Sequence, residues 1–154
     1  MSTDTLTPAQ RDDLRTVASM MIPESAEYRV PGADDTRIQA DILTTLGRDT
    51  KQVAAALDHL ACLAGGALSR LDPARREAVV RQFRADGGPP AATLVRVVLQ
   101  CYYRDDRVLH SLGIEPRAPF PRGHVLPDGD WSVLDPVKER GGGLRRAPQV
   151  IRDL

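Results

Sequence analysis

Aromatic residues and cysteines are scarce in this sequence. Tryptophan, tyrosine and phenylalanine together make up 4% of its 154 residues, whereas 42% of the residues are hydrophobic. A chain of this length and hydrophobic content can bury the core of one domain. Cys62 and Cys101 are the two cysteines, too few and too far apart for a disulfide scaffold. We expect both to be reduced packing residues.

Net charge and long apolar runs are also missing. Lysine plus arginine and aspartate plus glutamate both number 21, so the surface as a whole has no field that would hold nucleic acid. No run approaches the roughly 20 apolar residues that span a bilayer, and the first residues, "MSTDTLTPAQ", do not have the regions of an export signal. These features predict a cytoplasmic protein without membrane insertion and without a nucleic-acid partner.

Apolar residues recur at helical spacing through most of the chain, and the alternation typical of strands is absent. Thr7 and Asp72 can each cap a helix that begins at the following proline. The clearest apolar stripe, from residue 53 to residue 71, is interrupted by Gly65 and Gly66, which we expect to permit close approach of a neighbouring helix. The fold prediction is all-α, with a compact bundle of about five helices in residues 1–113.

A fifth helix is predicted over residues 91–105, and it is apolar on two adjacent sides. One side carries Leu94, Val97, Val98 and Cys101, and the other carries Val95, Leu99 and Tyr102. Such a helix is expected to lie centrally and to pack on both sides. The remaining face is available to solvent or to another protein, and its residues are Thr93, Arg96, Gln100, Tyr103 and Arg104.

Residues 114–154 differ in character from the rest of the chain. Proline and glycine are frequent there, and almost no apolar periodicity remains. The segment is predicted to be an extended tail that cannot fold alone. It would wrap this domain's own helices or a partner subunit, with its end mobile.

Candidate chemical sites are weak. Asp105 and Asp106 could hold magnesium, but Leu109 and His110 occupy the positions where a further acid would be needed. Ion pairing of Asp105 and Asp106 with the flanking arginines, Arg104 and Arg107, or with a neighbouring element explains them better.

A zinc site is equally weakly supported. His59 and Cys62 are three residues apart on a helix and could form half of a zinc site completed by Cys101 or His124. His59 faces away from the core stripe, however, which favours a solvated or partner-facing role. No nucleophile motif or phosphate-binding glycine loop is present. We therefore predict no catalytic, cofactor-binding or metal-binding residues in this chain.

Several segments carry a resemblance to a known family. They are "LTPAQRDDLRTVASMMIP", "VPGADD", "DILTTLGRD", "LDPARRE", "VVLQCYYRDDRVLHSLGIEPRAPFPRGHVL" and "DGDWSVLDPV", and the stretch from "CYYRDDR" to "FPRGH" is the most specific. Over about residues 6 to 137 the chain resembles the gluconate 2-dehydrogenase subunit 3 family. The resemblance implies a small, cofactor-free helical subunit that accompanies a large FAD-dependent sugar oxidoreductase of the glucose-methanol-choline type.

The resemblance also bears on location. Many members of that family carry a twin-arginine export signal, and the N-terminal residues of this sequence depart from that pattern. The departure makes a cytoplasmic dehydrogenase or oxidase of sugars or glycosides the closer analogy. The alternative left open is a free-standing helical adaptor that binds a protein or peptide and has no redox role.

A helix end rich in tyrosine and arginine, followed by a tail with isolated aromatic residues, is typical of a large permanent interface. We expect Tyr102 to point inward and Tyr103 to point outward, with Phe120 and Trp131 as anchors on the partner. The predicted partner-binding residues are Tyr102, Tyr103, Arg104, Asp105, Asp106, Arg107, Phe120, Pro121, His124 and Trp131.

Overall fold

The structure is a computed structural model that describes residues 5–118, 120, 122–123 and 128–140. The chain divides into two units, residues 1–117 and residues 118–154. The described residues contain helices and no strand, which confirms the all-α prediction. The first unit contains α1 (Pro8–Met21), α2 (Thr36–Thr45), η1 (Gly47–Asp49), α3 (Thr50–Ala64), η2 (Leu68–Arg70), α4 (Pro73–Asp86), α5 (Gly88–Tyr102) and α6 (Asp106–Ser111), where η denotes a 3-10 helix.

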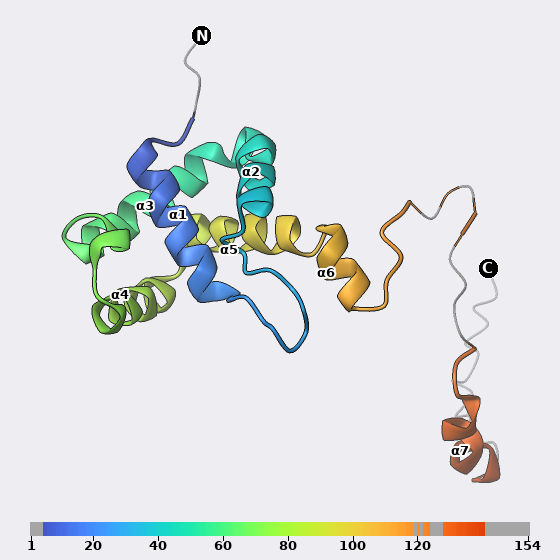
Figure 1. The fold of residues 1–154 in the computed structure, drawn as a ribbon. Coiled ribbons are helices and arrows are strands. Elements are labelled where there is room, and N and C mark those ends of the chain that lie inside the picture. Colours follow the sequence, from blue (N-terminus) through green and yellow to red (C-terminus); the bar gives the residue numbers. More distant parts are fainter. Residues whose placement is uncertain (1–4, 119, 121, 124–127, 141–154) are drawn as a thin grey trace, which may run out of the picture. The chain divides into compact units, whose positions relative to one another are not determined.

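Helix α5 runs through the middle of the first unit (Figure 1). It packs against α3 and α2, while α3 also packs against α1 and α4. Leu94, Val97 and Val98 of α5 are buried together with Leu57 and Leu60 of α3. The predicted compact bundle of about five helices is therefore present, and α6 is a short addition that the sequence pattern did not indicate.

The starts of α1 and α4 follow from their capping residues. The side chain of Thr7 accepts a hydrogen bond from the backbone N–H of Gln10 (3.2 Å), and the Gln10 side chain accepts one from the Thr7 N–H (2.9 Å). Asp72 accepts from the backbone N–H of Arg75 (3.0 Å) at the start of α4. These caps satisfy N–H groups that have no partner within the helix, so both predicted helix starts are confirmed.

The prediction for the glycine pair after α3 was wrong. Gly65 ends the helix in a left-handed conformation (φ 67°), and the N–H groups of Gly65 and Gly66 bond to the carbonyls of Cys62 and Ala61. A Cβ atom built at either glycine would meet no atom within 4 Å, so neither permits a close helix approach. Gly65 is needed instead as the C-cap of α3, because a left-handed C-cap favours glycine.

Helix α5 also differs from its prediction at both ends and in its packing. It begins at Gly88 instead of residue 91. It ends at Tyr102, and Asp105 caps the next helix, because the Asp105 carboxylate accepts from the Arg107 N–H. Only one of its two apolar sides is fully packed. Val95 and Leu99, on the second side, remain 39% and 36% exposed.

The second unit contains η3 (Trp131–Leu134) and α7 (Asp135–Glu139). Asp130 starts η3 by accepting hydrogen bonds from the backbone N–H and the hydroxyl of Ser132 (3.0 and 2.6 Å). Every described residue from 118 to 140 is exposed, so this unit has no core of its own among its described residues. The end that was predicted to be mobile, residues 141–154, lies outside the described residues.

Candidate functional site

The most specific sequence motif lies where α5 gives way to α6. The chain leaves α5 at Tyr102, turns through Tyr103 and Arg104, and enters α6 after Asp105. The turn is held by a backbone hydrogen bond from the Asp105 N–H to the Tyr102 carbonyl (3.1 Å). This turn brings both arginines of the motif, Arg104 and Arg107, within reach of α2.

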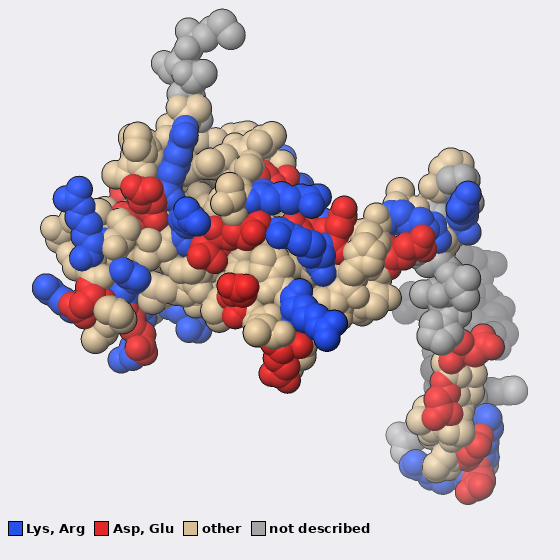
Figure 2. All heavy atoms as spheres, in the orientation of Figure 1, with Lys and Arg blue, Asp and Glu red and all other residues tan. Residues whose placement is uncertain are grey.

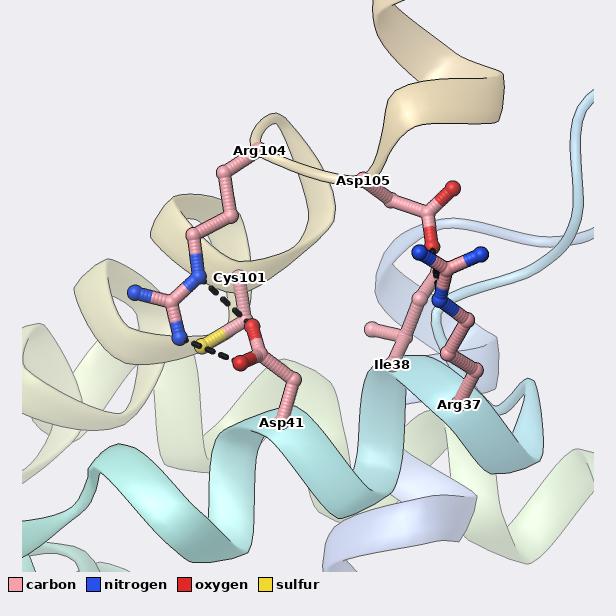
Figure 3. Close-up of a pocket in the computed structure, with 6 residues that line it drawn as sticks. All are labelled: Arg37, Ile38, Asp41, Cys101, Arg104 and Asp105. Atoms are coloured by element: carbon pink, nitrogen blue, oxygen red, sulfur yellow. Dashed lines mark hydrogen bonds and ion pairs between the residues drawn. The ribbon is translucent and has the colours of Figure 1, made fainter. Parts of the chain in front are cut away.

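Helix α2 and its N-cap supply the acidic partners. Arg104 donates from Nε and Nη2 to the two carboxylate oxygens of Asp41, both at 2.6 Å (Figure 3). This two-point geometry matches a planar guanidinium to a planar carboxylate. The pair is partly accessible, since the side chains of Arg104 and Asp41 are 49% and 36% exposed. The hydrogen bonds to Asp41 raise the pKa of Arg104.

Arg107 holds two carboxylates at once. Its Nη2 lies 2.7 Å from Asp35 Oδ1, and its Nε lies 2.9 Å from Asp105 Oδ1. Asp105 is buried, with 4% of its side chain exposed. The hydrogen bonds from Arg107 lower the pKa of both Asp35 and Asp105, against the opposing effect of burial, and raise the pKa of Arg107. The buried Asp105 carboxylate is therefore kept charged mainly by Arg107.

Arg37 of α2 completes the cluster from the other side. Its guanidinium lies 4.0 Å from Asp105 and 3.7 Å from Asp106, and its side chain is 66% exposed. We refer to the whole set as the α2–α6 ion-pair network. Its members are Asp35, Arg37, Asp41, Arg104, Asp105, Asp106 and Arg107.

A hollow of about 300 Å³ opens within this network. Figure 3 shows Arg104 and Asp41 on one side of it and Arg37 and Asp105 on the other, with Cys101 near Asp41. The Cys101 sulfur lies 3.4 Å from the Thr45 hydroxyl, and burial raises the pKa of its thiol. A thiol with a raised pKa is a poor nucleophile. The charged side chains that line the hollow already pair with one another. These ion pairs join α2 to the end of α5 and the start of α6.

The two tyrosines separate as predicted. Tyr102 is 4% exposed and Tyr103 is 52% exposed, and their rings meet edge to face with centroids 5.2 Å apart. Burial raises the pKa of Tyr102. Tyr103 therefore presents an aromatic ring to solvent beside the ion-pair network.

The predicted tail anchors are only partly described. Phe120 is 86% exposed and Trp131 is 68% exposed. Pro121 and His124 lie outside the described residues. The structure therefore brings together the predicted residues from Tyr102 to Arg107, whereas the partner-binding role of the whole set stays a prediction.

The alternative zinc site is not assembled by the described residues. His59 pairs with Asp86 (3.2 Å) and its ring contacts Phe83, with centroids 5.5 Å apart. Cys62 is exposed, so its predicted packing role was wrong, while that of Cys101 is confirmed. Among the described residues, no group of three or more histidine, cysteine or acidic residues is placed so that it could hold a metal ion. His124 is not among them.

The sequence pattern did not indicate the ion-pair partners that lie on α2 and at its N-cap. Asp35, Arg37 and Asp41 belong to this chain, so the carboxylates that pair with Arg104 and Arg107 are not supplied by another protein. A weak signal was present, because Ile38, Asp41 and Thr45 follow the i, i+3, i+7 spacing of one helix face. Nothing in that spacing says which distant arginine the face will meet.

Charged side chains of both signs are interspersed over the face of the first unit shown in Figure 2, and neither sign gathers into one area there. Across the described part of the chain, no helix has the length and apolar character required to cross a membrane. Comparison of the chain with family models, curated proteins and solved structures finds no match.

Proposed function

We propose that this chain is a non-catalytic small subunit that binds and stabilises a large FAD-dependent dehydrogenase or oxidase acting on sugars or glycosides. The family and the partner come from the sequence resemblance at "CYYRDDR" to "FPRGH" and the flanking segments. FAD would belong to the large subunit. Cytoplasmic location is part of the same proposal.

The observation that carries a binding role is the composition of the second unit. Trp131, Val133 and Val137 are each more than half exposed, and no described residue of this unit is buried. Exposed aromatic and aliphatic side chains on a segment without a core are costly in water, because burying each is worth on the order of 2 kcal/mol. Such a segment is suited to being covered by a large partner.

The ion-pair network supports this role indirectly. It fixes the turn that follows α5, and Tyr103 stands exposed on that turn next to Arg104. Tyrosine and arginine are enriched at the energetic centres of interfaces. A rigid turn presents them without a large loss of conformational entropy on binding.

Co-expression tests the proposal. The chain is produced together with a large FAD-dependent sugar oxidoreductase of the glucose-methanol-choline type, and the complex is purified through a tag on this chain. We expect a stoichiometric complex that contains FAD, and a wild-type chain that shows no flavin absorbance and no sugar oxidation when purified alone. A chain that remains monomeric with that flavoprotein, and binds another protein, would favour the free-standing adaptor instead.

Trp131→Ala tests whether the second unit contributes to assembly with the large subunit. It should weaken assembly by about tenfold or more, because a truncated interfacial tryptophan commonly costs at least ~2 kcal/mol. The helical circular dichroism signal should remain, since Trp131 is 68% exposed. Glu139→Ala, which truncates an exposed side chain at the end of α7, serves as the control. If Trp131→Ala bound the large subunit with unchanged affinity, the Trp131 side chain would not be part of the interface.

A further inference from the structure

A second surface of the helical unit, separate from the ion-pair network, has the chemistry of a docking groove. Its walls come from α1, α4 and α5, and it encloses about 360 Å³. Nine of its ten lining residues are apolar, and Arg84 is the exception. The lining residues are Val17, Met20, Met21, Ile22, Val80, Phe83, Arg84, Leu94, Val95 and Leu99.

A second hollow of about 520 Å³ adjoins this groove, because the two share Met20, Val80 and Arg84. The second hollow is more polar, with Glu77 and Arg81 in its lining. Apolar and charged walls thus follow one another along α4. This arrangement suits a peptide segment with both kinds of side chain better than it suits an acyl chain.

The apolar part of the groove includes the two apolar residues of α5 that remain partly exposed. Val95 and Leu99 lie one helical turn apart and remain 39% and 36% exposed, on the side of α5 that the sequence pattern predicted to be packed. Met20 and Met21 line the same groove, and methionine side chains adapt readily to an incoming surface. Leucine-sized side chains at helical spacing would fit between them.

The positive charge of Arg84 at the groove favours an occupant with a negatively charged group. Arg81 is already paired with Glu77 (2.8 Å). Arg84 is exposed and forms no ion pair among the described residues, and it stands where the two hollows meet. A carboxylate placed there would meet an unpaired guanidinium, whereas an ammonium group would be repelled.

We infer that the groove between α1, α4 and α5 binds an amphipathic helix of a partner protein, which inserts apolar side chains between Met20, Val95 and Leu99 and places a carboxylate against Arg84. Recognition of an apolar helix face by a groove is a common mode of peptide binding. The inference does not depend on the identity of the large subunit in the proposed function.

The test uses the full chain and two fluorescent helical peptides. Both have an alanine-based sequence with leucines at i, i+3 and i+7, and one carries glutamates beside that face where the other carries lysines. The acidic peptide should bind about tenfold or more tightly than the basic one, as measured by fluorescence anisotropy at low salt. Equal binding of the two peptides would overturn the inference.

Variants locate the binding on this surface. Arg84→Glu should weaken the binding of the acidic peptide by about tenfold and strengthen the binding of the basic one. Arg75→Glu makes the same change of charge on α4 outside the groove and should leave the binding of both peptides unchanged. Leu99→Ser, at a position that is 36% exposed, should weaken the binding of both peptides. Circular dichroism checks that each variant is folded.

Three other results would also contradict the inference. Peptide binding insensitive to both Arg84→Glu and Leu99→Ser would place the site elsewhere. A wild-type chain that dimerises in sedimentation, and becomes monomeric with Leu99→Ser, would show that a second copy fills the groove. Dodecanoate that binds at the groove more tightly than the acidic peptide would show a lipid site. Because the peptides are tested on this chain alone, failure here leaves the co-expression result unaffected.

Discussion

Arg104 and Asp41 lie 63 residues apart in the sequence, and their side chains form two hydrogen bonds of 2.6 Å each. Arg107 makes the equivalent connection to Asp35 at the start of the same helix. The two arginines of one short motif therefore hold Asp35, the N-cap of α2, and Asp41, near the middle of that helix. The difference between them is burial, because Arg107 also pairs with the buried carboxylate of Asp105.

The first prediction uses this difference. Arg107→Met should lower the free energy of unfolding by about 3 kcal/mol, because it leaves the buried Asp105 carboxylate without its main partner. Arg104→Met should lower it by only about 0.5–1 kcal/mol, since Asp41 remains accessible to water. Urea titration monitored by circular dichroism gives both values. Equal losses for the two variants would show that burial of Asp105 does not govern the network.

The second prediction concerns acid. The pKa values of Asp35 and Asp105 are lowered in the folded chain, so their contribution to stability is complete above the unfolded value of about 3.9 and is lost as pH falls through the folded values. The wild-type chain should therefore lose stability steeply below about pH 4.

Arg107→Met removes the main cause of both shifts, so its stability should fall less steeply over the same pH range. Arg75→Met, which removes a charge on α4 outside the network, is the control and should retain the wild-type slope. Thermal unfolding at a series of pH values measures the slopes. A steep acid transition preserved in Arg107→Met would assign it to other carboxyl groups.

The third prediction concerns the thiols. Cys62 is exposed, whereas Cys101 is 3% exposed and its thiol has a pKa raised by burial. A thiol reagent should modify one cysteine rapidly in the native chain and the second only on unfolding. Cys62→Ser should show no rapid modification. Mass spectrometry of the labelled peptides identifies the site, and rapid labelling of Cys101 would contradict the burial.

The fourth prediction concerns the end of α3. Gly65→Ala should destabilise the chain by about 1 kcal/mol, because alanine is strained in the left-handed conformation that closes the helix. Space is not the reason, since a Cβ atom there meets no neighbour within 4 Å. Ala64→Gly, at the preceding position inside the helix, probes helix propensity alone. A stabilised Gly65→Ala would indicate that the helix extends past Gly65.

The sequence by itself determined the features that depend on neighbouring residues. Helical periodicity, the caps at Thr7 and Asp72, and the inward and outward directions of Tyr102 and Tyr103 follow from spacing and from local hydrogen bonds. The end of α5 was misplaced because Asp105 has two local roles open to it. It can continue one helix or cap the next, and the fold selects the cap.

Only the tertiary structure decided which charges meet. Asp41 could pair with any of many arginines, and packing of α2 against α5 places Arg104 next to it. The placement of α1 and α4 beside α5 leaves Val95 and Leu99 facing a groove instead of the core, although their spacing is that of buried residues. An apolar stripe indicates which face of a helix tends to be buried. The element that covers this face is determined by contacts between segments far apart in the sequence.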